Sequence, residues 1–284
     1  MFQQITILGP GLLGASLAMA IRKNALAKRI VIWARSSESR SKCHQQEWCD
    51  AIFESPQEAV AESDLVLLCT PVHTIVSLLE TIQPVLKQDA LISDVGSTKA
   101  LICTKAQQIF KESPATFLGA HPMAGSEQTG MANARSDLFK DAACILTPLP
   151  ETPTSKIQLL TNFWKSLKMR VTAVTPETHD AIVAHISHLP HILASALCSY
   201  LTKKDNSWQS LSGGGLKDTT RIAAGDPELW KQILEQNRAE ILQAIDGFEQ
   251  QLGALKTALT ENNSEEILAQ LHQGKTYRDR LNSE

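Results

Sequence analysis

The 284-residue sequence has little of what would direct a protein into a membrane, out of the cell or onto a nucleic acid. Aromatic residues make up only 5% of it, and no uninterrupted apolar run approaches the roughly 20 residues that span a bilayer. Residues 1–4 place no basic group ahead of an apolar stretch, so we expect no secretory signal. A formal net charge of −3 removes the general electrostatic argument for binding nucleic acid or anionic membranes. We therefore expect a cytoplasmic protein without a nucleic acid or a membrane as partner.

The cysteines lack the spacing of a disulfide framework or a zinc site. The one close pair has five residues between its members, which does not match a zinc knuckle, and several of the others lie inside apolar runs. We interpret them as reduced thiols of a cytosolic protein. The six are Cys43, Cys49, Cys69, Cys103, Cys144 and Cys198.

The first part of the chain alternates short apolar runs with stretches of helical length. An ordinary hydrophobic fraction of 43% and a length above that of a usual single domain predict a folded protein of two domains. Continuous apolar runs suit strands buried on both faces, as in a parallel sheet covered by helices. We expect strands at 5–8, 30–33, 65–69, 91–95, 116–119, 143–147 and 170–174, and helices at 12–23 and 74–86.

The chain after residue 175 is predicted to be helical. Apolar residues recur at spacings of three and four between residues 178 and 201 and form a stripe on one helix face, and Asp226-Pro227 is typical of a helix start. A last helix is expected from about residue 263. Because these helices look unable to bury their stripes alone, we expect a homodimer formed through this half. The stripe contains Ile182, Ile186, Leu189, Leu193 and Ala196.

A glycine-rich loop directly follows the first predicted strand. Gly9, Gly11 and Gly14 form the pattern G-x-G-x-x-G, in which the glycines allow a tight turn, close approach of a pyrophosphate and close helix–strand packing. The alternative is a glycine-rich turn without a ligand. With the alternating pattern, the loop predicts a Rossmann-type dinucleotide-binding domain over 1–175, followed by an all-helical dimerisation domain over 176–284. Predicted cofactor contacts are Gly9, Gly11, Leu12, Leu13, Gly14 and Thr70.

The end of the second strand bears on the choice of cofactor. NAD sites usually place a carboxylate there to bind the ribose 2′-hydroxyl, but here the first carboxylate is Glu38. Arg35 and Ser36 instead suit a 2′-phosphate, which a guanidinium can bind bidentately. The alternative is that Arg35 is a solvated loop arginine. The sequence therefore favours NADP over NAD as cofactor.

Four histidines cluster at the start of the helical half, and a metal site is one interpretation of them. They are His179, His185, His188 and His191. Helical geometry argues against a metal, because the last three fan away from the apolar stripe and lack the i, i+4 spacing of a helical zinc site. We expect no metal, and of these residues we expect His188, at the edge of the stripe, to face a cleft.

Five motifs in order give the chain a resemblance to the prephenate/arogenate dehydrogenase family, over nearly its whole length. Each motif alone is modest support, but their order and spacing together are specific. The motifs are the glycine loop at 9–14, Asp-Val-Gly-Ser-Thr-Lys at 94–99, His-Pro-Met-Ala-Gly at 121–125, Ser-His-Leu-Pro-His at 187–191 and Lys-Asp-Thr-Thr-Arg at 217–221.

The resemblance implies an oxidative decarboxylation of prephenate to 4-hydroxyphenylpyruvate, or of arogenate to tyrosine. His121 matches the family's catalytic histidine, and Ser97 matches a serine that orients it beside the nicotinamide. Arg221 matches an arginine that binds a substrate carboxylate, and His188 matches a second histidine of the substrate site. Ser126 and Glu127 match positions near the mouth of the pocket. Because the chain ends at residue 284, we expect neither the mutase nor the regulatory domain that some family members add.

Two other functions are compatible with parts of this pattern. One is another β-hydroxyacid or imine dehydrogenase with a Rossmann-plus-helical plan, although β-hydroxyacid enzymes generally use a lysine on the first interdomain helix. The other is a non-catalytic nucleotide-sensing dimer, which would have no need of a proton acceptor beside the nicotinamide. The sequence does not decide between prephenate and arogenate.

Overall fold

A computed structural model describes residues 1–125 and 128–281 of the chain. The chain divides into two compact units, residues 1–237 and residues 238–284, and each is considered by itself. All six cysteines are free, as predicted.

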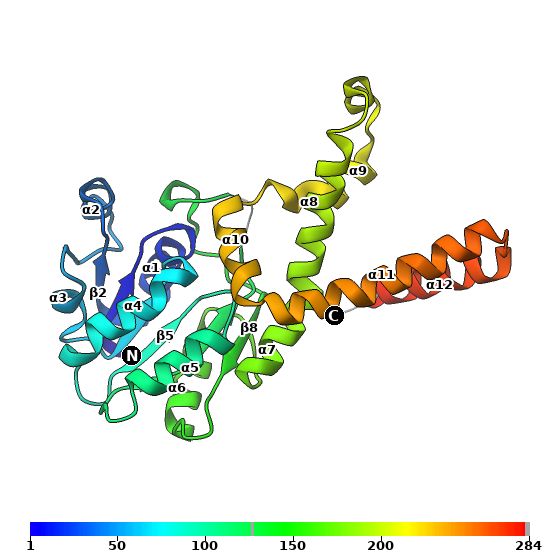
Figure 1. The fold of residues 1–284 in the computed structure, drawn as a ribbon. Coiled ribbons are helices and arrows are strands. Elements are labelled where there is room, and N and C mark those ends of the chain that lie inside the picture. Colours follow the sequence, from blue (N-terminus) through cyan, green and yellow to red (C-terminus); the bar gives the residue numbers. More distant parts are fainter. Residues whose placement is uncertain (126–127, 282–284) are drawn as a thin grey trace. The chain divides into compact units, whose positions relative to one another are not determined.

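The centre of the first unit is a six-stranded parallel sheet (Figure 1). Its order is β3-β2-β1-β4-β5-β6, so the direction of winding reverses between β1 and β4 and opens a crevice at the carboxyl ends of these strands. The predicted strands are confirmed, whereas the short β3 was not predicted. The strands are β1 (Phe2–Leu8), β2 (Ala27–Trp33), β3 (Ala51–Phe53), β4 (Leu65–Leu68), β5 (Leu91–Asp94) and β6 (Thr116–Phe117).

Helices cover both faces of this sheet, which explains the continuous apolar runs of its strands. Ile5 and Ile7 of β1 join the core on one face, and Val66 and Leu68 of β4 join the core on the other. The helices of this part are α1 (Leu12–Lys23), α2 (Ser37–His44), α3 (Pro56–Val60), α4 (Val72–Ile82) with the 3-10 turn η1 (Gln83–Val85), α5 (Ala100–Ile109) and α6 (Thr154–Ser166).

The single strand predicted at 116–119 is divided between the first sheet and a second, three-stranded sheet. The run 116–119 divides at Leu118, whose N–H still donates to Ile92 of β5 at 2.9 Å before the backbone leaves the first sheet. The strand β7 (Gly119–Pro122) then pairs antiparallel with β8 (Ala143–Thr147), which pairs parallel with β9 (Arg170–Ala173). The 3-10 turn η2 (Met131–Asn133) lies between β7 and β8.

A continuous helix over residues 176–201 follows the second sheet. It consists of α7 (Pro176–Val183), the π-helical turn η3 (Ala184–His188) and α8 (Leu189–Leu201). Pro190 cannot donate a helical hydrogen bond, and the π turn ends two residues before it, at His188. The first unit ends with η4 (Asn206–Leu211), α9 (Gly214–Thr220), η5 (Arg221–Ala224) and α10 (Pro227–Gln236), whose predicted cap by Asp226 is confirmed.

The burial of this helix differs from the sequence prediction. His179, His188 and His191 lie on its buried face, with exposed fractions of 0%, 1% and 5%, whereas Ile182 and Ile186 of the apolar stripe are exposed in the single chain. The exposed isoleucines agree with the expectation that this half cannot bury its apolar stripe alone. The burial of His191 was not expected, because the sequence prediction assumed a uniformly wound helix that turns His191 to the side opposite the stripe, and the π turn shifts the positions after residue 184.

Length and composition would also allow this helix to cross a membrane. It has 26 residues, its most apolar window has a mean hydropathy of 1.4, and 28% of that window is buried. A search for uninterrupted apolar runs misses such a helix, because the polar residues interrupt the run. Three of those polar residues, His179, Asp180 and His188, make hydrogen bonds to other elements, as described below. One such helix is weak support for a membrane span.

The second unit is a helical hairpin of α11 (Arg238–Thr260) and α12 (Ser264–Arg280). Asn263 caps α12 by accepting a hydrogen bond from Glu266 N at 3.1 Å, which confirms the predicted helix start. The domain boundary at 175/176 stays a prediction from the sequence.

Candidate active site

The glycine loop has the geometry that a dinucleotide phosphate requires. Gly9 has a backbone φ of +100°, in the left-handed region that favours glycine. A Cβ on Gly14 would lie 2.1 Å from the carbonyl oxygen of Gly9, so only glycine lets α1 approach β1 this closely. A Cβ on Gly11 would meet nothing within 4 Å, which leaves open space where the pyrophosphate would lie. Leu12 and Leu13 form the first turn of α1, where free amides point toward that space.

Thr70 lies directly beside this loop, after β4. Its methyl group would be 2.8 Å from a Cβ placed on Gly9. The Thr70 hydroxyl is buried and has no hydrogen-bond partner among the described residues. Because buried hydroxyls normally have partners, the orphaned Thr70 hydroxyl supports a ligand at this edge of the sheet.

The predicted 2′-phosphate contacts lie at the start of α2. Arg35 is exposed there, and Ser36 Oγ caps the helix by accepting from Ser39 N at 3.2 Å. A residue that sequence reasoning missed, Arg40, donates to the carbonyl oxygens of Ala34 and Arg35 at 3.0 and 2.9 Å and fixes this turn.

The carboxylate of Asp94 ties together the two segments that carry Ser97 and His121. It is fully buried and accepts hydrogen bonds from Gly96 N at 2.9 Å and Ala120 N at 3.4 Å. It also forms an ion pair with Lys99, which is equally buried. Gly96 precedes Ser97 and Ala120 precedes His121, so one carboxylate holds the backbone beside both residues. Ser97 is half-buried and His121 is 7% exposed.

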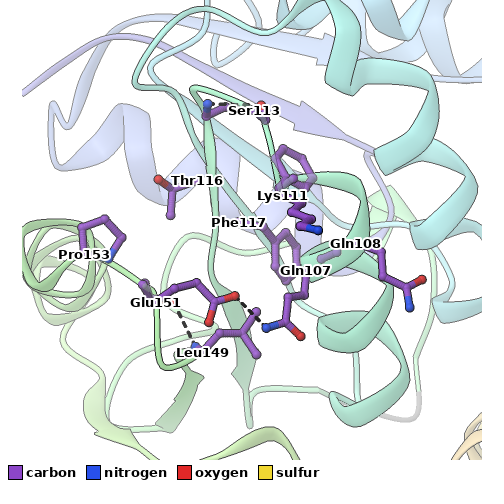
Figure 2. A pocket seen from close by; sticks show the side chains of 13 residues that line it. Gln107, Gln108, Lys111, Ser113, Thr116, Phe117, Leu149, Glu151 and Pro153 are labelled. Carbon is purple, nitrogen blue, oxygen red and sulfur yellow. Dashed lines mark hydrogen bonds between the residues drawn. The ribbon is translucent and has the colours of Figure 1, made fainter.

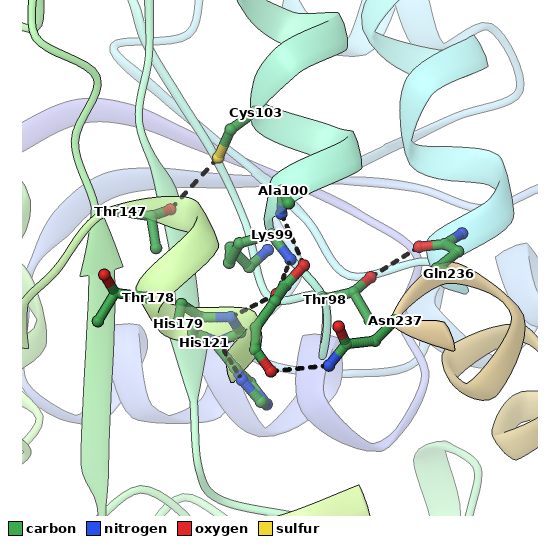
Figure 3. A network of polar contacts seen from close by, with 12 residues as sticks. Thr98, Lys99, Ala100, Cys103, His121, Thr147, Thr178, His179, Gln236 and Asn237 are labelled. Carbon is green, nitrogen blue, oxygen red and sulfur yellow. Dashed lines mark hydrogen bonds and ion pairs between the residues drawn. The ribbon is translucent and has the colours of Figure 1, made fainter. Parts of the chain in front are cut away.

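His121 is hydrogen-bonded to a residue of α7 (Figure 3). Its Nδ1 lies 2.8 Å from Nε2 of His179, and Nδ1 of His179 lies 2.7 Å from Oδ1 of Asp180. Asp180 also accepts from the backbone N–H groups of Lys99 and Ala100, at 2.7 and 2.9 Å, and so holds the N-terminus of α5.

Burial and nearby positive groups govern the pKa values of these three side chains. The pKa of His121 is well below its ordinary value because the ring is buried, with further lowering by His179, Lys99 and His188. Burial also lowers the pKa of His179, against the opposing effect of Asp180. Burial alone would raise the pKa of Asp180, but its hydrogen bonds from His179 and the N-terminus of α5 lower it. At neutral pH the site therefore holds two neutral imidazoles and a carboxylate.

His188 lies in the same region and is held by Asn237. The Asn237 side-chain amide donates to the carbonyl oxygen of Asp180 at 2.8 Å and lies 3.1 Å from Nδ1 of His188. Because the same NH₂ group serves both contacts, Nδ1 of His188 accepts and its proton is on Nε2. That Nε2 is buried without a partner among the described residues, and burial lowers the pKa of His188 to about 4. His188 is therefore neutral, and its Nε2–H can donate a hydrogen bond to a ligand.

Trp230 joins this part of the site to the segment of Arg221. Its indole stacks on His191 with ring centroids 3.5 Å apart and meets His188 edge-on at 6.1 Å. The backbone of Ile222 is hydrogen-bonded to His191, and η5 packs against α8. Arg221 is exposed at the start of η5. Ser126 and Glu127 lie outside the described residues.

A separate pocket of about 490 Å³ lies at the C-terminal end of α5 (Figure 2). Gln107 and Glu151 on its wall are hydrogen-bonded to each other at 2.8 Å. Because α5 runs back from the carboxyl edge of the sheet, this pocket lies at the amino edge, away from the glycine loop. Across the described residues, no group of three His, Cys, Asp or Glu side chains is placed to hold a metal ion.

Two family models match the chain. The model "Prephenate dehydrogenase, nucleotide-binding domain" matches residues 17–173, and "Prephenate dehydrogenase, dimerization domain" matches residues 175–273. The chain belongs to the prephenate dehydrogenase family. Members of the prephenate dehydrogenase family are NAD(P)-dependent oxidoreductases of tyrosine biosynthesis, and this chain is one of them.

Similar proteins of this family include enzymes named for either substrate. A prephenate dehydrogenase of Bacillus subtilis is 34% identical over 98% of this chain and 76% of its own length. A structure of A. aeolicus prephenate dehydrogenase with hydroxyphenyl propionate and NAD+ has a TM-score of 0.92, with 30% identity and 99% of both chains covered. A Synechocystis arogenate dehydrogenase structure has a TM-score of 0.84, with 29% identity over 98% of this chain and 99% of that one.

Sequence reasoning missed the side chains that connect the motifs. The motif at 94–99 contains Asp94 and Lys99 but gives neither a role, the histidine pattern presents His179 only as a candidate metal ligand, and no motif points to Asp180 or Asn237. The available signal was polarity in an apolar setting: Asp94 interrupts a buried strand, and the His179-Asp180 pair interrupts an apolar helix.

Proposed function

We propose that His121 accepts the proton of the ring hydroxyl in the oxidative decarboxylation of prephenate or arogenate. The observation that carries this proposal is a buried imidazole near the carboxyl end of β7, tied through Asp94 to the segment of Ser97 and kept neutral by its lowered pKa. A neutral imidazole is ready to accept a proton as the ring carbon takes on carbonyl character. Ser97, from the segment that Asp94 ties to His121, orients the imidazole and the reacting carbon.

The residues of the glycine loop fit a nicotinamide dinucleotide. Gly11 leaves room for the pyrophosphate, the amides of Leu12 and Leu13 face it, and the orphaned hydroxyl of Thr70 lies at the same edge. When bound, the nicotinamide supplies the acceptor for the hydride of the ring carbon.

Two positions supply the groups that hold a dianionic substrate. Arg221 binds one carboxylate, because a guanidinium offers two parallel donors to it. His188 offers its Nε2–H to a second oxygen, since its Nδ1 is occupied by Asn237. For Ser126 and Glu127 we retain the prediction of a place at the pocket mouth.

NADP is the cofactor that the end of β2 favours. No carboxylate follows β2 before Glu38, and that side chain forms an ion pair with Lys42 at 2.6 Å. Arg35 is exposed beside the N-terminus of α2, whose amides favour an anion. The similar A. aeolicus structure contains NAD+, so both cofactors belong in the test.

The test measures reduced cofactor formed from prephenate and from arogenate, each with NAD and with NADP. We expect turnover of at least one substrate, and we expect His121→Asn to lower kcat about 10²-fold or more while the substrate still binds. His185→Asn is the matched control, because His185 is an exposed histidine of η3. Absence of turnover with all four combinations, or an unchanged kcat in His121→Asn, would contradict the proposal.

A further inference from the structure

Hydrogen-bond chemistry assigns the proton positions in the Asp180, His179 and His121 triad. The carboxylate of Asp180 can only accept, so Nδ1 of His179 carries the proton of the 2.7 Å contact. A neutral imidazole has one N–H, which makes Nε2 of His179 an acceptor. The 2.8 Å contact to His121 is then donated by Nδ1–H of His121. His121 is left with a lone pair on Nε2, the nitrogen that faces away from the triad.

We propose that His179 is a positioning residue that fixes the His121 proton on Nδ1 and takes that proton during the reaction, with Asp180 stabilising the resulting imidazolium. The inference deepens the proposed function and rests on its assignment of His121 as proton acceptor. In this step the substrate O–H bond breaks and its proton goes to Nε2 of His121, while the proton on Nδ1 moves to Nε2 of His179. Once the ring is aromatic, both protons move back and the phenolate oxygen is protonated, so none is consumed.

The charges around His121 explain why a second imidazole is needed. Lys99 lies on one side, and its partner Asp94 is already occupied by that ion pair and by two backbone donors. His188 is neutral because burial lowers its pKa, and the Cys144 thiol on β8 stays neutral because burial raises its pKa, so neither offers a negative charge to a protonated His121. A proton that remained on His121 would therefore lack a carboxylate contact. On His179 the same charge lies 2.7 Å from Asp180.

The substitution His179→Gln separates positioning from proton acceptance. Glutamine places an amide oxygen near the former Nε2, which keeps an acceptor for His121 Nδ1–H but cannot take its proton. We expect kcat to fall about 10- to 100-fold with KM within about threefold of wild type. The pKa of the acid limb of the kcat profile should fall by roughly one unit. In the wild type the proton that blocks catalysis is held on His179 beside Asp180, whereas in the variant it must be held on His121, which has no carboxylate beside it. Asp180 is unsuitable as a test position, because it also holds the N-terminus of α5.

The matched control is His185→Gln, which replaces an exposed histidine of the adjoining turn whose Nδ1 lies 2.9 Å from the carbonyl oxygen of Ala181. It should keep both kcat and the acid limb. A His179→Gln enzyme whose acid limb coincides with that of wild type would overturn the relay.

A spectroscopic readout makes the result independent of turnover. In the wild-type enzyme with ¹⁵N-labelled histidine, the signal that disappears in His121→Asn should show a protonated Nδ1 and an unprotonated Nε2. A proton on Nε2 of His121 would refute the inference even if the enzyme is active. Conversely, the expected tautomer in a protein that converts neither substrate would refute the proposed function and leave the tautomer assignment standing.

Discussion

Two buried carboxylates organise the residues around His121. Asp94 accepts from two backbone amides and the ammonium of Lys99, and Asp180 accepts from two backbone amides and His179. A buried carboxylate is tolerated only when donors replace its lost hydration, and each of these has several. The donors come from segments up to 81 residues away, so each carboxylate fixes the relative position of distant segments.

The clearest prediction for a single residue concerns Arg35. If it binds a 2′-phosphate, Arg35→Ala loses a charged hydrogen bond worth about 1.5–3 kcal/mol, so the Kd for NADP should rise about 10- to 100-fold. The Kd for NAD should change less than about twofold. Lys28→Ala, which removes another exposed positive charge near the start of β2, is the control. Titration of the protein with each cofactor measures this, and equal weakening of both would remove Arg35 from the phosphate site.

The elements of the first unit could largely be predicted from the sequence, because their signals are local. Apolar runs predict the buried strands, the glycine loop predicts the turn into α1, and Asp226 marks the start of α10. In the second unit, Asn263 marks the start of α12 in the same way. The second sheet and the π turn could not be predicted, because they depend on contacts made after the chain folds. The same limit applies to the site: the motif residues were identified, but the bond between His121 and His179 joins residues 58 positions apart.

The turn between β1 and α1 offers a test in which two glycines have different roles. Gly14→Ala should lower the free energy of unfolding by about 1–3 kcal/mol in the cofactor-free protein, because its Cβ would meet backbone. Gly11→Ala should leave the free energy of unfolding within about 0.5 kcal/mol, since that position is open, yet weaken dinucleotide binding. Denaturant unfolding and cofactor titration measure the two effects. Equal destabilisation by both substitutions would contradict the assignment of Gly14 to helix–strand packing and of Gly11 to dinucleotide binding.

At the scale of the whole molecule, the continuous helix over 176–201 buries several polar residues and exposes part of its apolar stripe. The inward face supplies His179, Asp180 and His188 to the site, and the outward face carries the exposed Ile182 and Ile186. Such an arrangement is unfavourable for a single chain in water but suits a region that matches a dimerisation domain. One helix can therefore connect assembly with the geometry of the triad.

Replacing Ile186 by lysine tests whether this outward face is the interface. Each isoleucine buried against a partner contributes about 1.5–3 kcal/mol, and a buried unpaired ammonium would cost more than that. We expect light scattering to give a mass near 31.1 kDa for Ile186→Lys and twice that value for the wild type. Gln88→Lys adds the same charge at an exposed turn of the nucleotide-binding domain and should keep the wild-type mass. If Ile186→Lys forms a dimer with the same dissociation constant as the wild type, the interface lies elsewhere and the exposure of this stripe has no explanation.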